Sequence, residues 1–399
     1  MIGHQKYFLL LLLLLAVPAG SNELKATGPD VIPGAYRTEM YVSALQGKKV
    51  AVAGNHTSII NRTHLVDTLM SLGIEVVKAF SPEHGFRGEA AHGEWVDSET
   101  DAKTGIPIIS LYGSNRRPTP EQLADVDIIV FDIQDVGVRF YTYLSTMTYI
   151  MQAAARESIP VMILDRPNPL GHYVDGPILE LAHASFVGLH PVPVVHGMTP
   201  AEYAQMVNGE RWLGMNETCE LIIIPVKNYT HSSHYLLPVP PSPNLPNMHS
   251  VYLYPSLCFF EGTDISLGRG TDKPFQVFGH PELPEPLFPY TFTPQSVRAA
   301  PNPPQLNQTC NGRDLSVLSL EELQQMSQIN LEYLIVAYRH FPNKPGFFNN
   351  FFERLAGNAL LRHQITVGYT AAQIRASWQE DLVKFKKMRS AYLIYPDFD

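Results

Sequence analysis

The feature that most constrains the fold is an alternation of strand-like and helix-like runs between residues 47 and 165. Apolar runs typical of buried strands occupy residues 47–53, 73–80, 106–112, 126–133 and 160–165. Between them, apolar residues recur at helical spacing, most clearly in 64–72 and 144–156. This rhythm predicts an α/β fold in which a parallel sheet is connected by crossover helices.

The composition changes after about Tyr173, where prolines become dense. A further strand is expected at 221–226, an irregular connection at 279–304, and helices from about 320, with the best helical runs at 371–378 and 381–389. We therefore predict a parallel-sheet catalytic domain over residues 24–190. A second, smaller α/β (α+β) domain is predicted over residues 191–399.

The N-terminal segment has the pattern of a secretory signal peptide over residues 1–20. Lys6 precedes the apolar run 8–17, and small residues follow at 18–21. The run is short for a membrane span, although a signal anchor is the alternative. We expect a secreted, extracellular protein, or a lysosomal one in a eukaryote. Glycan acceptor sequences then become relevant, and they occur at Asn55, Asn61, Asn216, Asn228 and Asn307.

Charge and cysteine content exclude several classes of function. The net charge is −9 without a basic block, which argues against nucleic acid or an anionic membrane as the main partner. No later apolar run is long enough to insert stably into a membrane. The three cysteines Cys219, Cys258 and Cys310 allow at most one intramolecular disulfide and fit no zinc spacing. No phosphate-binding or dinucleotide motif is present, so neither a cofactor nor a metal is expected; the oligomeric state stays open.

Polar residues gather in four loops that follow predicted strands. In parallel sheets the carboxyl ends of strands share one edge, so the loops 54–58, 83–94, 132–143 and 165–168 should meet there. The second loop places Glu83, His84 and Arg87 directly after Pro82. A solvated turn in which glutamate and arginine pair with each other is the alternative interpretation.

Paired carboxyl groups in these loops point to glycoside hydrolysis, which needs a proton donor and usually a second carboxylate. Glu83 and Glu94 form such a pair, and Asp132 or Asp135 are further candidates. For Glu94 and Asp135 the alternative is an ordinary ion pair with Arg87 or Arg139. A proton donor needs a raised pKa, which desolvation provides.

Two other features of the sequence suggest ligand contacts. Three tyrosines near the loops have rings that can stack on a sugar: Tyr112, Tyr141 and Tyr143. The turn 268–271 places Arg269 and Lys273 beside glycine amides and is a candidate anion pocket. A glycine-rich connector is its alternative interpretation.

Several of these segments together resemble a known family. The clearest is Ser81-Pro-Glu-His-Gly-Phe-Arg-Gly88, and the others are 110–113, 117–120, 130–137, 139–143, 164–169, 196–199, 240–244, 261–263, 268–271 and 375–378. The pattern is similar to the exo-β-N-acetylmuramidase NamZ family, formerly a domain of unknown function (DUF1343). The resemblance spans nearly the whole chain after residue 20. It departs from the usual pattern at 170–172 and at Lys273.

The resemblance implies a Rossmann-like domain beside a smaller α/β domain, with the site in the cleft between them. It also implies removal of terminal, non-reducing β-linked N-acetylmuramic acid from peptidoglycan-derived saccharides, with Glu83 as the catalytic glutamate and Glu94 beside it. The expected substrate-binding residues are Asn55, His84, Arg87, Asp132, Gln134, Arg139, Tyr141, Arg166, Asn168, His196, Asn244, Glu261 and Arg269. A non-catalytic muropeptide or glycan binder, or another hydrolase such as an amidase or esterase, remains the alternative.

Overall fold

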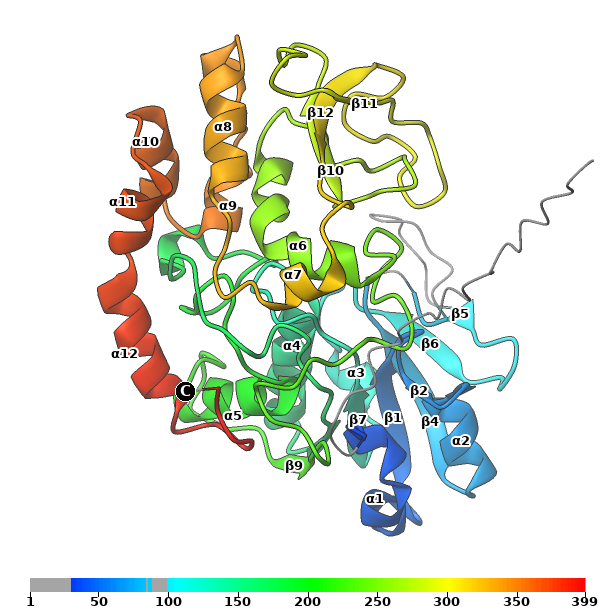
Figure 1. The fold of residues 1–399 in the computed structure, drawn as a ribbon. Coiled ribbons are helices and arrows are strands. Elements are labelled where there is room, and N and C mark those ends of the chain that lie inside the picture. Colours follow the sequence, from blue (N-terminus) through cyan, green and yellow to red (C-terminus); the bar gives the residue numbers. More distant parts are fainter. Residues whose placement is uncertain (1–29, 84, 88–98, 399) are drawn as a thin grey trace, which may run out of the picture. The chain divides into compact units, whose positions relative to one another are not determined.

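The computed structural model describes residues 30–83, 85–87 and 99–398. The predicted signal peptide lies outside these residues, as do two predicted site residues, His84 and Glu94. The described part confirms the predicted α/β class, with a mostly parallel sheet in the N-terminal part and a smaller sheet in the C-terminal part (Figure 1).

The larger sheet has seven strands in the order β5-β6-β4-β1-β7-β8-β9. The strands are β1 (Lys49–Gly54), β4 (Glu75–Ser81), β5 (Glu99–Thr100), β6 (Pro107–Ser110), β7 (Ile128–Asp132), β8 (Val161–Leu164) and β9 (Leu221–Ile224). Neighbouring strands run parallel except β5, which pairs with β6 in the antiparallel sense. The last strand, β9, follows the boundary predicted at residue 190, and that boundary stays a prediction.

The strand order reverses direction between β1 and β7. From β1 the chain adds β4 and then β6 on one side, and it then returns to add β7, β8 and β9 on the other. Such a reversal leaves a crevice at the carboxyl ends of the two central strands, where open α/β sheets place their ligands. Here Gly54 lies opposite Asp132, and the Ser58 hydroxyl donates to the Asp132 carbonyl across the reversal.

Helices cover both faces of this sheet. They are α1 (Thr38–Leu45), α2 (Leu65–Ser71), α3 (Pro120–Leu123), α4 (Tyr143–Arg156) and α5 (Pro200–Gly209). Alternate residues of a strand point to opposite faces, and β1 accordingly sends Val50 and Val52 into the core beneath α1 and α2. Ala51 and Ala53 face the core that contains α4 and α5. Burial on both faces explains why the strand sequences are continuously apolar.

Capping explains where two of these helices begin. Thr119 accepts a hydrogen bond from the Gln122 amide, the Gln122 side chain bonds back to the Thr119 amide, and Pro120 opens α3. Thr199 and Glu202 make the same reciprocal pair at the start of α5. Such boxes satisfy backbone donors that the first turn leaves without an intrahelical acceptor. Thr119 followed by Pro120 is a signal for a helix start that is visible in the sequence itself.

The C-terminal part contains the smaller, antiparallel sheet, ordered β10-β12-β11, together with most of the remaining helices (Figure 1). Its elements are α6 (Met248–Leu257), β10 (Val277–His280), β11 (Tyr290–Phe292), β12 (Cys310–Asp314), α7 (Leu320–Gln324), α8 (Glu332–His340), α9 (Phe352–Ala356), α10 (Leu360–Thr366), α11 (Ala371–Ala376) and α12 (Gln379–Arg389). The stretch 279–304 was expected to be irregular, but it contains β11. A short hairpin, β2 (Ile59–Ile60) with β3 (Thr63–His64), follows β1.

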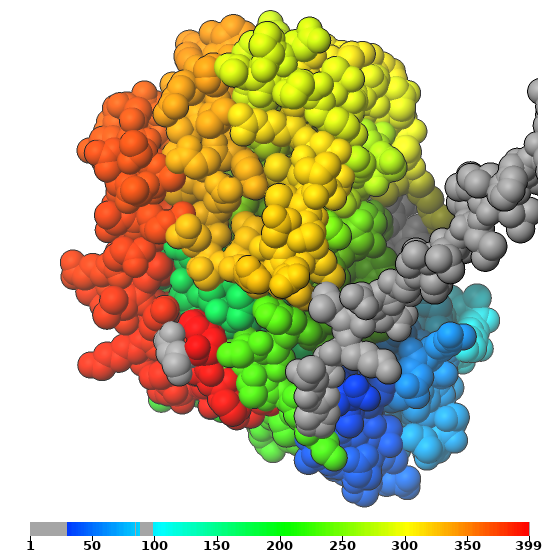
Figure 2. Space-filling model, viewed as in Figure 1, coloured from blue at the N-terminus to red at the C-terminus, as the bar shows by residue number. Residues whose placement is uncertain are grey.

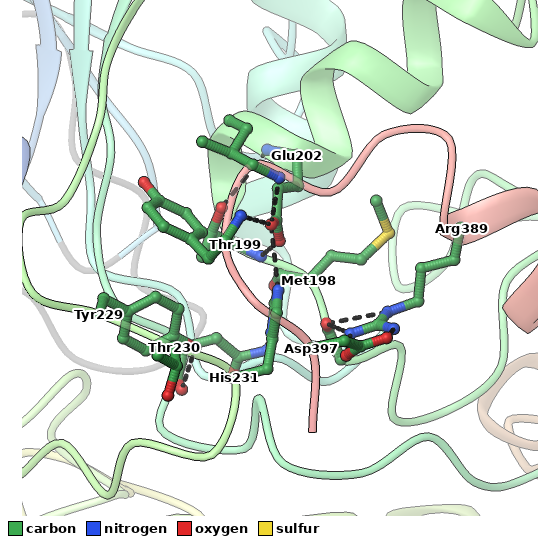
Figure 3. Close-up of polar contacts among 12 residues, drawn as sticks. Met198, Thr199, Glu202, Tyr229, Thr230, His231, Arg389 and Asp397 are labelled. Atoms are coloured by element: carbon green, nitrogen blue, oxygen red, sulfur yellow. Dashed lines mark hydrogen bonds and ion pairs between the residues drawn. The ribbon is translucent and has the colours of Figure 1, made fainter. Parts of the chain in front are cut away.

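The C-terminal segment, residues 389–398, is held against the region of α5 by buried polar contacts. Figure 2 shows this segment in red beside the green surface of the α5 region. Glu202 is fully buried, and its Oε1 accepts from His231 Nε2 at 3.0 Å and from the Ile394 amide at 2.8 Å (Figure 3). Arg389 binds Asp397 and the Gly197 carbonyl. The end of the described chain is therefore part of the core.

None of the helices in the described ranges has the length and hydropathy needed to cross a membrane.

Candidate active site

A hollow of about 640 Å³ lies where loops from the carboxyl edge of the large sheet meet the C-terminal part; we call it the main hollow. Glu83 follows β4, Tyr112 follows β6, and Tyr141 follows β7. The facing wall includes Asn244 and Arg269. Its volume lies within the range of small-molecule sites. Residues far apart in the sequence thus converge on one concave surface.

Glu83 is the carboxyl group at the sheet edge of the main hollow, and it is 8% exposed. Its Oε2 accepts a hydrogen bond from the Thr142 hydroxyl at 3.3 Å. Burial, and then the charge of Glu83, raise the pKa of Tyr112 above its ordinary value. The same two causes raise the pKa of Tyr143, with burial the larger. Glu83 is therefore surrounded by hydroxyl groups in a place that water reaches poorly.

Aromatic rings form one wall of the main hollow. The Tyr141 and Tyr143 rings meet edge to face with centroids 4.7 Å apart, and the Tyr141 hydroxyl donates to the Pro241 carbonyl at 2.7 Å. Tyr254 links Tyr141 to Phe275, at centroid distances of 6.0 and 5.1 Å. Because these hydroxyls and rings hold one another, the wall is rigid. Such a wall suits the apolar face of a sugar ring.

Positive charge exceeds negative charge in the lining. Among the described residues, three arginines and two glutamates line the main hollow, so their formal charge is one positive when all five are ionised. Arg269 forms an ion pair with Glu261, and the Arg116 guanidinium stacks over Phe186 with 4.5 Å to the ring centroid. Within the described residues, neither Arg116 nor Arg354 is in an ion pair. The hollow can therefore accept an anionic group.

Five of the site residues predicted from the sequence line the main hollow: Glu83, Tyr141, Asn244, Glu261 and Arg269. Asn244 has a further role, because its Nδ2 donates to the Ala299 carbonyl at 3.1 Å and so holds the loop 294–304. Tyr112 and Tyr143, singled out from the sequence for stacking, are also in the lining.

Other predicted site residues lie beneath the hollow, where they brace its loops. Asp132 and Arg166 form a fully buried bidentate ion pair, with Nε–Oδ1 and Nη2–Oδ2 distances of 2.6 and 2.8 Å. Gln134 donates to the Pro167 carbonyl, and Asn168 donates to the Met198 carbonyl. These contacts join the loops that follow β7 and β8. Their roles as substrate ligands stay predictions.

Four more predicted residues also lie outside the lining, namely Asn55, Arg87, Arg139 and His196. Asn55 Oδ1 accepts from the Thr57 amide and hydroxyl, and burial lowers the pKa of His196 to about 3, so its imidazole is neutral. Arg87 is paired with Asp67 and Asp101. The alternative pairing of Arg87 with Glu94 involves a residue outside the described ranges and stays a prediction.

Arg139 is the clearest case of a structural arginine among the predicted site residues. It is 4% exposed and makes no ion pair with Asp135. Its guanidinium donates instead to four backbone carbonyls, those of Pro177, Val192, Leu355 and Ala356. Gly357, which follows Ala356 in the chain, has φ +80°. A Cβ at this position would come within 2.7 Å of Arg139 Nη2. Arg139 thus joins the β7 loop to the end of α9.

Sequence reasoning did not select several residues of the lining, among them Arg116, Phe186 and Arg354. Arg116 lies in the loop after β6, at the same sheet edge as the four loops chosen. This position in a loop after a predicted strand could have identified Arg116 as a candidate site residue. Phe186 and Arg354 come from segments without a motif, and only the tertiary structure brings them here.

A carboxyl group, aromatic faces and a cationic rim at the carboxyl edge of an α/β sheet are the features of a carbohydrate-processing enzyme. Family comparisons give the class more closely. The models described as "Exo-beta-N-acetylmuramidase NamZ", N-terminal and C-terminal, match residues 50–249 and 252–395. The chain is 40% identical over 375 residues to the Bacillus subtilis (strain 168) peptidoglycan β-N-acetylmuramidase NamZ, covering 89% of each chain.

Solved structures agree with this assignment. A DUF1343 family protein of Bacteroides fragilis is 50% identical, with a TM-score of 0.86, and covers 92% of this chain and 100% of its own. A second DUF1343 protein of the same organism is 27% identical, with a TM-score of 0.75 and the same coverage. The chain therefore belongs to the exo-β-N-acetylmuramidase NamZ family, as its motifs indicated, and it is a glycosidase.

Proposed function

We propose that this protein is secreted and removes terminal, non-reducing β-linked N-acetylmuramic acid from peptidoglycan fragments, with Glu83 as the general acid. The observation that carries this proposal is the position of Glu83. It is a buried carboxyl at the sheet edge, inside a hollow with aromatic walls and excess positive charge. The relative from Bacillus subtilis is a peptidoglycan β-N-acetylmuramidase, which supports the substrate class.

In the proposed reaction, Glu83 donates a proton to the glycosidic oxygen as its bond to the anomeric carbon of muramic acid breaks, and a water molecule supplies the hydroxyl group that this carbon carries in the released sugar. Burial favours the neutral form of a carboxyl group, which a proton donor requires. The proposed second carboxylate is Glu94, which lies outside the described residues. Glu261 is already paired with Arg269, and this pairing suits a substrate-binding role better than a role in proton transfer.

Recognition of muramic acid is assigned to the cationic rim. The lactyl group of this sugar carries a carboxylate, which a guanidinium binds well through paired N–H donors. Arg116 and Arg354 lie in the lining without ion pairs among the described residues, so no side-chain carboxylate has to be displaced before they bind one. Tyr141 and its aromatic neighbours would contact the apolar face of the same ring.

Secretion and glycosylation form a separate part of the proposal. The pattern of residues 1–20 supports secretion. Four of the acceptor asparagines are exposed, namely Asn61, Asn216, Asn228 and Asn307, whereas Asn55 is fully buried. Expression in a eukaryotic secretory host followed by mass spectrometry should find glycans only at exposed positions. A glycan on Asn55 would contradict the described packing.

The activity is tested by incubating the protein with aryl β-N-acetylmuramide, aryl β-N-acetylglucosaminide and a muramyl peptide. We expect release of the aryl group from the muramide alone. Binding of N-acetylmuramic acid without turnover of any substrate would favour a non-catalytic binder. Cleavage of the muramyl peptide bond would favour an amidase.

A further inference from the structure

A second hollow of about 770 Å³ adjoins the main hollow, and we call it the side hollow. The two share three lining residues, Glu261, Arg269 and Phe351. Glu83 lines the main hollow but not the side hollow. A bond cleaved with the help of Glu83 therefore lies in the main hollow, and the side hollow is left for a more distant part of the ligand.

The wall of the side hollow is built by the loop 294–304 and is anchored along its length. The Gln295 amide donates to the Gly270 carbonyl at 2.9 Å, and Ala299 accepts from Asn244 at 3.1 Å. Val297 and Ala300 exchange two backbone hydrogen bonds in a tight turn. Gly270 has φ +81°, and a Cβ there would come within 2.3 Å of the Gln295 carbonyl oxygen. The loop thus closes onto the turn that carries Arg269.

The lining of the side hollow combines an apolar surface with three charged residues, which are the pair of Glu261 and Arg269 and, on the loop 294–304, Arg298. Ile265, Leu267 and Ala300 are buried apolar residues of the wall. Glu261 and Arg269 present an acceptor and a donor side by side. Arg269 Nη1 is buried and has no hydrogen-bond partner among the described residues. A donor in this position is available for an oxygen atom of a ligand, and leaving it without one is costly.

This chemistry fits a sugar residue. A hydroxyl group both donates and accepts, which matches a carboxylate beside a guanidinium. The face of a pyranose ring is apolar, as is the wall around Leu267.

We propose that the side hollow is a subsite for a saccharide residue of the leaving glycan chain. The proposal rests on the proposed function: if a terminal muramic acid occupies the main hollow, the chain continues only on the leaving-group side. Longer substrates then gain contacts with Arg269 and the loop 294–304 that an aryl muramide does not make.

The test compares substrates of different length on variants that fill the side hollow. Ala300→Trp adds a bulky side chain to the wall, and Ala300→Leu is made in parallel as a smaller change that the fold tolerates more easily. Val297→Trp is the matched control, because Val297 is on the same loop, 41% exposed and outside the lining. Values of kcat/KM are measured for aryl muramide, for a muramyl disaccharide and for a tetrasaccharide.

We expect Ala300→Trp to lower kcat/KM for at least one of the saccharides by roughly tenfold, the size of a lost pocket contact. Turnover of the aryl muramide should stay within about twofold of the wild type, and Val297→Trp should leave all three substrates unchanged. Equal losses on aryl muramide and saccharides, or no loss on either saccharide, would overturn the subsite. A selective loss on a peptide-bearing muramide instead would assign the side hollow to peptide and also overturn it. If the wild type cleaves none of these substrates, the proposed function fails and not the subsite alone.

Discussion

Glu261 and Arg269 form an ion pair that lines two adjoining hollows at once. Their side chains are 24% and 13% exposed, and the guanidinium also stacks over Phe275 with 5.0 Å to the ring centroid. Removing one partner of such a pair leaves the other charge poorly solvated. The pair therefore lies at the boundary between the two hollows, and Arg269 Nη1 is left without a hydrogen-bond partner among the described residues.

Arg116 is expected to recognise the carboxylate of muramic acid. Arg116→Ala should weaken inhibition by free N-acetylmuramic acid roughly tenfold or more, since a hydrogen bond to a charged group contributes about 1.5–3 kcal/mol. Inhibition by N-acetylglucosamine, which lacks the carboxylate, should change little. Arg313→Ala is the matched control, because Arg313 also stacks on an aromatic ring, that of Phe288, but lies outside the main hollow. If Arg116→Ala weakened inhibition by both sugars equally, Arg116 would not be the residue that recognises the carboxylate.

Arg139 is expected to be essential for stability and not for substrate affinity. Arg139→Met removes the donor from four buried carbonyls, so the free energy of unfolding should fall by about 3 kcal/mol or more. Arg156→Met, at the exposed end of α4, should have little effect on thermal unfolding. A variant with unchanged stability and a raised KM would instead identify Arg139 as a substrate ligand.

Tyr395 connects the C-terminal segment to the sheet. Its hydroxyl donates to Asp165 at 2.6 Å and accepts from the Val226 amide at 2.8 Å. Tyr395→Phe leaves both groups without this partner, so we expect a loss of about 2–3 kcal/mol in unfolding free energy. The conservative control is Tyr369→Phe, at a residue that is 43% exposed. Because Tyr395 is not in the lining of the main hollow, kcat for a muramide should stay near that of the wild type; a large change in kcat at unchanged stability would contradict this account.

Asp135 should make the protein less stable as the pH rises. Burial raises the pKa of its carboxyl to about 7 in the folded protein, whereas an exposed aspartate has a pKa of about 3.9. Between these values the folded state binds more protons than the unfolded state. The contribution of this group to stability is therefore present below about pH 4 and is lost as the pH rises to about 7.

The test is Asp135→Asn, which keeps an oxygen to accept from the Gly137 amide. Denaturant unfolding at pH 5 and pH 8 should show that the variant gains about 1 kcal/mol or more, relative to the wild type, on going from the lower to the higher pH. Asp381→Asn, on the exposed surface of α12, serves as the control. An identical difference at the two pH values would mean that Asp135 is not protonated in the folded state near neutrality.

The sequence was most informative where local rules decide the structure. The run 126–133 became β7 because a central strand buried on both faces must be apolar throughout, and Thr119 with Pro120 marked the start of α3. β11 was missed. It has three residues in a proline-rich stretch, and it exists because Phe292 pairs with Cys310 across a long loop.

Site residues were harder to predict because a charged side chain can pair with a residue that lies far away in the sequence. Arg139 and Arg166 occupy motif loops at the sheet edge, as an arginine that binds substrate would. Their partners include Ala356 and Asp132, which are 217 and 34 residues away in the sequence. Only the folded chain separates these structural arginines from Arg116, which faces the main hollow.

The most direct test of the account is the activity of Glu83→Gln on two leaving groups. A general acid matters most when the leaving group is a sugar hydroxyl, and loss of such a group costs about 10²–10⁴-fold in rate. We expect kcat/KM for a muramyl disaccharide to fall about a thousandfold and that for a nitrophenyl muramide, whose leaving group departs more readily, to fall much less. Glu285→Gln, at an exposed position, should leave both unchanged. Near wild-type activity of Glu83→Gln on the disaccharide, or equal losses on the two substrates, would contradict the assignment of Glu83 as the proton donor.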